Sequence, residues 1–217
     1  MKTMIFGAAL AAALVSTPAL AQDQAAPSFT GPRVEARVGW DHVVVSAAAD
    51  DGVNSGEGSA TKSGVTYGGE AGFDFDLNNL VVGAYAGIEG SSTKQCSEFY
   101  GEDNLCLKAG RNITVGARVG GKVGTNVLLY AKGGYSNGKL KASYEDFENV
   151  VDDFRVSESV DGFHLGAGIE AQLRGGLYGK LEYVYTNYKG GSYDDGDVSL
   201  NADLERHQII AGVGIRF

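Results

Sequence analysis

The three histidines of the chain, His42, His164 and His207, are its best candidates for acid–base chemistry. A hydrolase built on a β-strand needs a serine nucleophile on the same strand face as the histidine, two residues away. The residues that follow each histidine at that spacing are Val44, Gly166 and Ile209. The sequence therefore predicts no catalytic residue and no enzyme. It also predicts no metal centre and no cofactor.

The two cysteines, Cys96 and Cys106, lie in one polar stretch with nine residues between them. They lack the close spacing and the neighbouring histidine of a redox or metal pair. In an oxidising compartment we expect them to form a disulfide. A link that closes a loop of this size stabilises the fold by roughly 2–3 kcal/mol.

Acidic residues cluster in the polar stretches around residues 145–153 and 194–197. The simplest interpretation is that these are charged, soluble loops. Divalent-cation binding is the alternative, although the full twelve-residue calcium loop is missing. The net charge of −9 argues against nucleic acid as a partner, because phosphate binding needs clustered Lys and Arg.

The N-terminus has the pattern of an export signal. Lys2 precedes an apolar run over residues 5–15, and residues 16–21 end in the small-x-small pattern that signal peptidase requires. We predict a signal peptide over residues 1–21, a short periplasmic segment over 22–30 and a single domain over 31–217. No later segment approaches the roughly 20 apolar residues of a membrane-spanning helix.

The rest of the chain alternates apolar residues with polar residues or glycine, which predicts strands. We expect strands over residues 33–44, 64–75, 80–90, 111–123, from 127 onward, 162–173, 177–188 and up to 217. Tight turns are expected at 76–79, 124–126 and 174–176, and long polar connections at 47–63, 91–108, 145–160 and 189–203. Short turns that alternate with long loops are typical of membrane barrels. The predicted fold is an all-β, transmembrane, eight-stranded, antiparallel up-and-down β-barrel.

Alternation alone leaves open a soluble, lipocalin-like barrel with its apolar face inside. The polar face favours the membrane barrel, because it carries seven acids and seven bases in an acidic chain, and buried charges must pair. The predicted interior network consists of Arg33, Glu35, Arg37, Asp41, Glu70, Asp74, Glu89, Arg118, Lys122, Lys132, Glu170, Lys180, Glu182 and Arg216. We expect His164 to join this network and His207 to lie near the rim.

Aromatic residues gather at the strand ends, which favours a membrane wall with two aromatic girdles. The residues predicted for the girdles are Trp40, Tyr67, Phe73, Phe75, Tyr135, Phe163, Tyr185 and Phe217. Phe29 and Tyr188 also fall at strand ends and are expected in the same two bands. The chain closes on Phe217 with an apolar residue at every second position, the pattern that the outer-membrane assembly machinery reads.

Several segments resemble the opacity-type outer-membrane barrels of alphaproteobacteria, within the OmpA-like group. The resemblance covers most of the chain after residue 21. It is carried by residues 114–122 (TVGARVGGK), 128–135 (LLYAKGGY), 166–170 (GAGIE), 180–185 (KLEYVY) and 212–217 (GVGIRF). It implies a surface or envelope-stability role, sometimes porin-like, and fixes no substrate.

Together these patterns predict a monomer in the outer membrane of a Gram-negative bacterium, in contact with outer-membrane lipid and lipopolysaccharide. Eight strands enclose an interior just wide enough for side chains to fill. We therefore expect a structural or adhesion-like surface role with a lumen filled by charged side chains. The alternative is a narrow, porin-like channel for small solutes or ions.

Overall fold

The computed structural model describes residues 28–50, 55–99, 103–145, 154–189, 192–194 and 199–217. For residues 47–50, 55–57, 94–99, 103–109, 140–145, 154–156, 192–194 and 199–202, only the backbone is described. The predicted signal peptide lies outside these residues, as do most of the acidic clusters.

Eight long strands form the wall of the molecule. They are β1 (Gly31–Asp50), β2 (Ser55–Leu77), β3 (Leu80–Ser91), β5 (Asp103–Val123), β6 (Val127–Glu145), β7 (Phe154–Gln172), β8 (Leu177–Tyr188) and β10 (Ser199–Arg216). Two short strands extend the sheet beyond the wall: β4 (Lys94–Phe99) pairs with β5, and β9 (Ser192–Asp194) pairs with β10. In the part of the chain that is described, no helix is long and apolar enough to cross a membrane.

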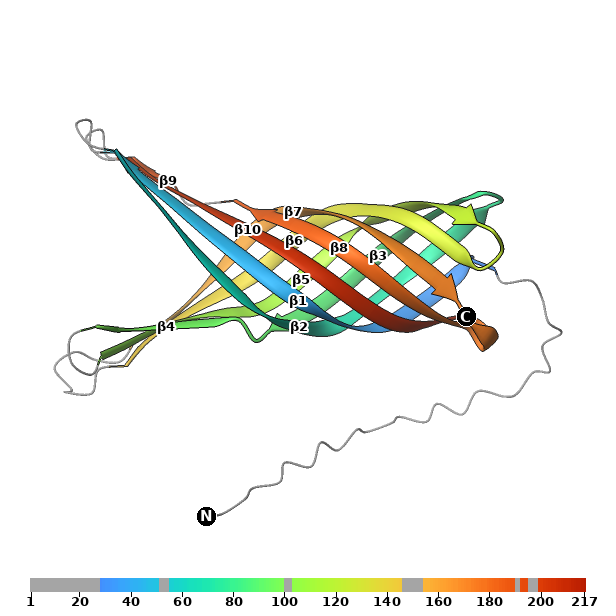
Figure 1. Cartoon of the computed structure of the whole chain (residues 1–217), viewed down its shortest axis with the longest axis horizontal. Helices are drawn as coiled ribbons and strands as arrows, with labels where there is room; N and C mark the ends of the chain where they lie inside the picture. The colour runs from blue at the N-terminus through green and yellow to red at the C-terminus, as the bar shows by residue number, and fades with distance from the viewer. Residues whose placement is uncertain (1–27, 51–54, 100–102, 146–153, 190–191, 195–198) are drawn as a thin grey trace, which may run out of the picture.

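The wall is a closed barrel in which every neighbouring pair of strands is antiparallel (Figure 1). Consecutive wall strands are neighbours, and β10 closes the barrel by pairing with β1 from Arg33↔Arg216 to Asp50↔Ser199. Closure removes the sheet edges, whose unpaired backbone groups lipid cannot satisfy. The predicted up-and-down, eight-stranded topology is therefore confirmed.

Short connections lie at one end of the barrel, together with the start of β1 and the C-terminus (Figure 1). The β2–β3 turn contains Asn78 in the left-handed backbone region (φ 68°), and the β5–β6 turn contains Gly124 with φ 68°. Asn and Gly are the residues that adopt this conformation at least cost. A short 3₁₀ turn, Arg174–Gly176, joins β7 to β8. The three tight turns lie where the sequence predicts them.

The strands at the opposite end are longer than predicted. Residues 55–63, 103–108 and 154–160 were expected in long connections but continue β2, β5 and β7. A backbone ladder outside the membrane needs no apolar face, so alternation is lost there while the hydrogen bonding between strands persists. Alternation therefore marks the apolar part of each strand and not its full length.

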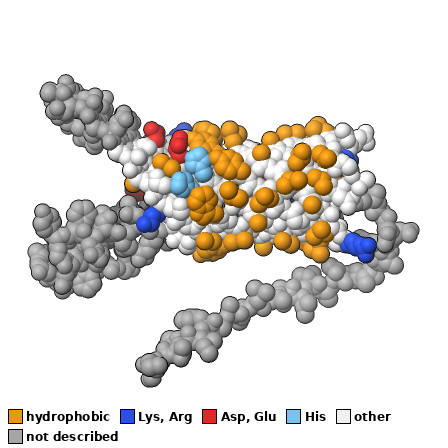
Figure 2. Space-filling model, in the orientation of Figure 1, with side chains coloured by type: hydrophobic (Ala, Val, Ile, Leu, Met, Phe, Trp, Pro, Cys, Tyr) orange, Lys and Arg blue, Asp and Glu red, His pale blue; other side chains and the backbone are white. Residues whose placement is uncertain are grey.

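The apolar face of the wall points outward, which excludes the lipocalin-like alternative. Val38, Leu181 and Val213 are 54 %, 53 % and 63 % exposed. On the face shown in Figure 2, apolar side chains are spread along the barrel surface, and charged groups are seen at its two ends. An apolar band between polar ends matches the environment of a bilayer.

Two inward-facing glycines show how the lumen accommodates large side chains. A Cβ at position 72 would lie 2.9 Å from Arg33 Nη2, and a Cβ at position 116 would lie 2.6 Å from the Tyr85 hydroxyl oxygen. Any larger residue would displace these groups. Glycine is therefore needed where a long side chain lies over its direct partner on the neighbouring strand.

Candidate functional site

The lumen is the candidate functional site, and its charged side chains form three groups along the barrel axis. The group nearest the short turns is centred on Asp74. Its carboxylate accepts from Arg118 Nη2 (2.6 Å) and Arg216 Nη2 (2.9 Å), and lies 3.2 Å from Arg33 Nε. Glu170 pairs with Arg118 and Arg216, each at 2.9 Å. β1, β2, β5, β7 and β10 are thereby linked inside the barrel.

The central group is built around Glu70 of β2. Its carboxylate lies 2.6 Å from Arg37 Nη1, 2.7 Å from Lys132 Nζ and 3.9 Å from Lys180 Nζ. Glu182 of β8 lies 3.3 Å from Lys132 and 3.0 Å from Lys180. Both carboxylate side chains are almost fully buried. Charged groups from β1, β2, β6 and β8 thus neutralise one another in a space with little access to water.

The group nearest the long hairpins joins Asp41 to Arg206 through two hydrogen bonds of 2.6 and 3.0 Å. Arg206 Nη1 also lies 2.8 Å from Glu89, whose other oxygen pairs with Arg37 at 2.9 Å. The Asn112 amide donates to Glu89 as well. Since Arg37 contacts both Glu89 and Glu70, the group nearest the long hairpins is continuous with the central group.

Glu35 joins the central group through Lys180, which lies 2.5 Å away, and also pairs with Arg33. Lys122 is then the one residue of the predicted interior network that lies outside the three groups. Its side chain is 21 % exposed and pairs with Asp76 at the rim beside the short turns. Arg206 is buried in the interior beside Asp41 and was not among the predicted residues. Arg206 lies two residues before Gln208 and therefore on the same face of β10, which was the available signal. However, β10 begins at Ser199, earlier than the alternation indicated. The buried set still holds seven acids and seven bases: Arg33, Arg37, Arg118, Lys132, Lys180, Arg206 and Arg216 face Glu35, Asp41, Glu70, Asp74, Glu89, Glu170 and Glu182.

Phe29 lies inside the end of the lumen near the short turns, not in the outer girdle where it was expected. It is fully buried against Val81, Leu128 and Tyr130, and the Arg216 guanidinium lies 5.3 Å from the centre of its ring. The chain there is held by hydrogen bonds from Gln172 to the Ser28 carbonyl and from the Asp76 amide to the Thr30 hydroxyl. Residues 28–30 therefore cross this mouth of the barrel and insert an aromatic ring into it.

The predicted girdle residues lie on the outer surface. Trp40, Tyr67, Tyr135 and Phe163 lie towards the long hairpins, and Phe73, Phe75 and Phe217 lie towards the short turns. Tyr185 is half-buried and donates a hydrogen bond to Glu205. Tyr188 was expected in the same band but is buried and faces inward, because its parity on β8 is opposite to that of Tyr185.

His164 lies in the lumen between two hydroxyl groups. Its Nε2 is 2.5 Å from the Tyr85 hydroxyl oxygen, and its Nδ1 is 2.8 Å from Ser136 Oγ. The strand register thus supplies a serine that spacing along one strand did not reveal. Ser136 is fully buried, however, and His164 is 2 % exposed. A substrate could not reach this hydroxyl without rearrangement of the lumen.

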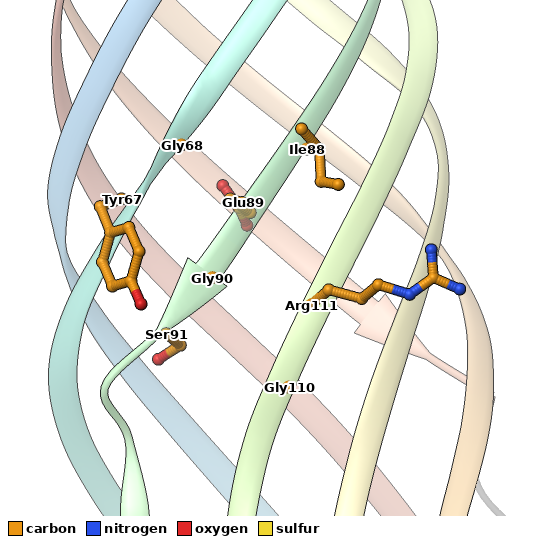
Figure 3. Close-up of a pocket in the computed structure, with 8 residues that line it drawn as sticks. All are labelled: Tyr67, Gly68, Ile88, Glu89, Gly90, Ser91, Gly110 and Arg111. Atoms are coloured by element: carbon orange, nitrogen blue, oxygen red, sulfur yellow. The ribbon is translucent and has the colours of Figure 1, made fainter. Parts of the chain in front are cut away.

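A groove of about 420 Å³ lies on the wall near the long hairpins (Figure 3). Tyr67 of β2 and Arg111 of β5 flank β3, and the Arg111 side chain points away from Tyr67. Glu89, which also borders the groove, is engaged in the lumen with Arg37 and Arg206. The polar groups that line the groove do not converge on a common point, so the groove lacks the geometry of an active site.

Cys96 and Cys106 are directly opposite one another in the β4–β5 pair. Their side chains lie outside the described residues, so the disulfide stays a prediction.

An outward apolar band, a closed antiparallel wall and a charge-balanced lumen define an integral β-barrel membrane protein. The chain belongs to the outer membrane protein beta-barrel domain family, which it matches over residues 7–217. It is therefore a protein of the Gram-negative outer membrane.

Similar proteins come from Brucella. The chain is 29 % identical over 247 residues to the 31 kDa outer-membrane immunogenic protein of Brucella melitensis, with all of both chains covered. It is 27 % identical over 195 residues to the 25 kDa outer-membrane immunogenic protein of Brucella abortus, covering 88 % of this chain and 84 % of that one. Among solved structures, it is similar to Neisserial surface protein A, with a TM-score of 0.46, 15 % identity, and coverage of 87 % and 98 %.

Proposed function

We propose that this protein is a non-enzymatic structural and surface component of the outer membrane, with a lumen closed by its own side chains. The observation that carries the proposal is the charge-balanced network, which runs without a break from Asp41 near the hairpins to Glu70 at the centre. Arg33 continues it to Asp74 near the short turns. A network of this kind links strands across the barrel and stiffens the wall.

Two features support a role at the cell surface. At the end opposite the short turns, the strands of the long hairpins continue past the rest of the wall (Figure 1). The Brucella relatives are described as immunogenic, which is consistent with exposed loops in those proteins. We therefore propose an envelope-stability or adhesion-like function, carried out by a monomer in contact with lipopolysaccharide.

The C-terminal strand supports delivery by the outer-membrane assembly machinery. Phe217 is 65 % exposed on the outer face, and Ile215, Val213 and Ala211 share that face. An accessible apolar strand ending in an aromatic residue fits recognition by strand pairing. A signal peptide over residues 1–21 and a disulfide between Cys96 and Cys106 complete the proposed maturation.

A narrow ion channel is the second candidate. Lys132 lies 2.7 Å from Glu70 and 3.3 Å from Glu182, so it can exchange partners without becoming unpaired. Such an exchange would rearrange the centre of the lumen at low cost. The route past Phe29 would still have to open.

Single-channel recording in planar bilayers tests the proposal. Folding is checked first by the heat-dependent mobility shift on SDS gels. The closed-lumen proposal expects a silent bilayer with folded protein inserted. Reproducible current steps that scale with salt concentration would contradict it and favour the channel. Altered ion selectivity in Arg118→Gln and Glu170→Gln variants would then assign the current to this lumen.

A further inference from the structure

Two histidines lie side by side on the outer surface of the barrel. His42 on β1 and His207 on β10 are direct partners across the antiparallel pair, and their ring centres are 6.4 Å apart. They lie next to one another where the apolar band ends towards the long hairpins (Figure 2). Both are half-buried, so their outer edges reach the surroundings.

Each ring is held in place through its Nδ1 atom. A hydrogen bond of 3.0 Å links His42 Nδ1 to Ser63 Oγ of β2, and one of 2.7 Å links His207 Nδ1 to the Tyr183 hydroxyl of β8. Among the described residues, none forms a hydrogen bond with the Nε2 atom of either ring. Histidines that bind a metal through one nitrogen almost always use the other for such a hydrogen bond, which fixes the orientation of the ring.

The surroundings match an ion site at the boundary between lipid and water. The rings of Trp40 and Tyr185 lie 5.3 Å from His42 and 5.2 Å from His207, respectively. Glu205 is two residues from His207 on the same strand face, where it accepts from the Tyr185 hydroxyl. A carboxylate and two imidazoles therefore occur on one small patch of the wall.

From this arrangement we infer that His42 and His207 bind a transition-metal ion of the Zn²⁺, Ni²⁺ or Cu²⁺ class through their Nε2 atoms. Neutral imidazole is a favoured ligand of these ions, whereas Mg²⁺ and Ca²⁺ prefer oxygen. No cluster of three or more His, Cys, Asp or Glu side chains suited to a metal occurs among the described residues. The ion is therefore held by two protein ligands, and water or a lipid phosphate oxygen completes its coordination.

The location gives the site a mechanical consequence. β1 and β10 are the first and last strands of the wall, and their pairing closes the barrel. An ion bridging His42 and His207 joins the two strands near the middle of this seam. Because the unfolded chain holds these residues far apart, the ion stabilises the closed barrel.

Trp40 provides a direct readout, since it is the only tryptophan of the chain and lies beside His42. The protein is purified from outer membranes without a polyhistidine tag and titrated with Cu²⁺, which quenches nearby tryptophan fluorescence. We expect saturable quenching, competition by Zn²⁺ and no competition by Mg²⁺. Mg²⁺ competing as well as Zn²⁺ would place the ion on oxygen ligands and overturn the inference.

Variants test the two ligands separately. His42→Gln and His207→Gln should each weaken binding by more than about tenfold, and the double variant should abolish saturable quenching. Tyr183→Phe removes only the hydrogen bond to His207 and should cause a smaller loss. Zn²⁺ should also raise the temperature of the gel mobility shift in the wild type but not in the double variant. Unchanged binding in the double variant, or in either single variant, refutes a site shared by both histidines.

Discussion

Neutralising Glu70 is the sharpest test of the charge network. Its carboxylate lies 2.6 Å from Arg37, 2.7 Å from Lys132 and 2.9 Å from Arg33, and its side chain is only 1 % exposed. Glu70→Gln keeps the shape but removes the charge, so the change creates no cavity. The cations beside it then lose a counter-charge in a buried space, and we expect a loss of about 3–5 kcal/mol in the free energy of unfolding.

The rim pair provides a matched control for this effect. Lys122 and Asp76 are 2.8 Å apart, with side chains 21 % and 15 % exposed. Water can solvate either group when its partner is lost, so Lys122→Gln should cost only about 0–1 kcal/mol. The two variants compare the same kind of ion pair inside the lumen and at its edge.

A double variant separates charge imbalance from the loss of individual contacts. Glu70→Gln combined with Lys132→Gln restores equal numbers of buried acids and bases. We expect it to lose about 0.5–3 kcal/mol less than the sum of the two single variants, because the groups are in contact. Additive losses would show that the balance of charge does not matter.

Urea unfolding in lipid vesicles, followed by Trp40 fluorescence, measures these free energies. Reversibility is checked by refolding on dilution, and the gel mobility shift reports the folded fraction independently. The reasoning fails if Glu70→Gln is no more destabilising than Lys122→Gln. That outcome would mean that water already solvates the lumen, and it would support the channel alternative.

Three further experiments test other parts of the structure. Phe29→Ala should lower the free energy of unfolding in urea by about 3–5 kcal/mol, as for other large buried side chains. It should also increase the frequency of current steps in planar bilayers. A variant with unchanged conductance would show that the ring does not close the lumen. After alkylation without reductant, mass spectrometry should find Cys96 and Cys106 unmodified. Prior reduction should allow two adducts and lower the free energy of unfolding by about 2–3 kcal/mol. Fluorescence of Trp40 should be quenched most strongly by lipids brominated near the headgroup, since its exposed ring lies beside His42 in the girdle towards the long hairpins. Maximal quenching at the bilayer centre would contradict this placement.

The alternation of residue types was sufficient to predict the wall of the barrel. Period-two patterning depends only on which face meets lipid, and that constraint acts on every strand in the apolar band. The balance of acids and bases on the other face then indicated which face was enclosed. Both inferences use physical requirements that hold locally, residue by residue, and so they survive errors in strand boundaries.

The errors occur where alternation stops. Lys122 and Arg206 have the correct parity for the lumen, but one lies at the rim and the other lies beyond the predicted start of its strand. Depth along the axis decides whether a lumen-facing residue is buried, and parity carries no information about depth. The same reason explains Phe29, whose segment folds back into the mouth instead of continuing along the wall.

Contacts between strands were also beyond the sequence. Ser136 reaches His164, and Ser63 reaches His42, from neighbouring strands. The search for a serine two residues from each histidine considered only one strand at a time. Register sets these pairings, and register follows from closure of the whole barrel, which no single segment specifies.

The charge balance of the lumen separates the electrostatics of the wall from those of the ends. Among the described side chains, seven bases and seven acids are buried in the lumen, and their charges cancel. The net charge of −9 is therefore the contribution of the remaining 11 bases and 20 acids of the chain. Because the lumen is neutral, its pairs stabilise the fold whatever charge the hairpins carry. Selection on the surface can then change the hairpins without disturbing the network, which is the physical condition for a rigid frame that presents variable loops.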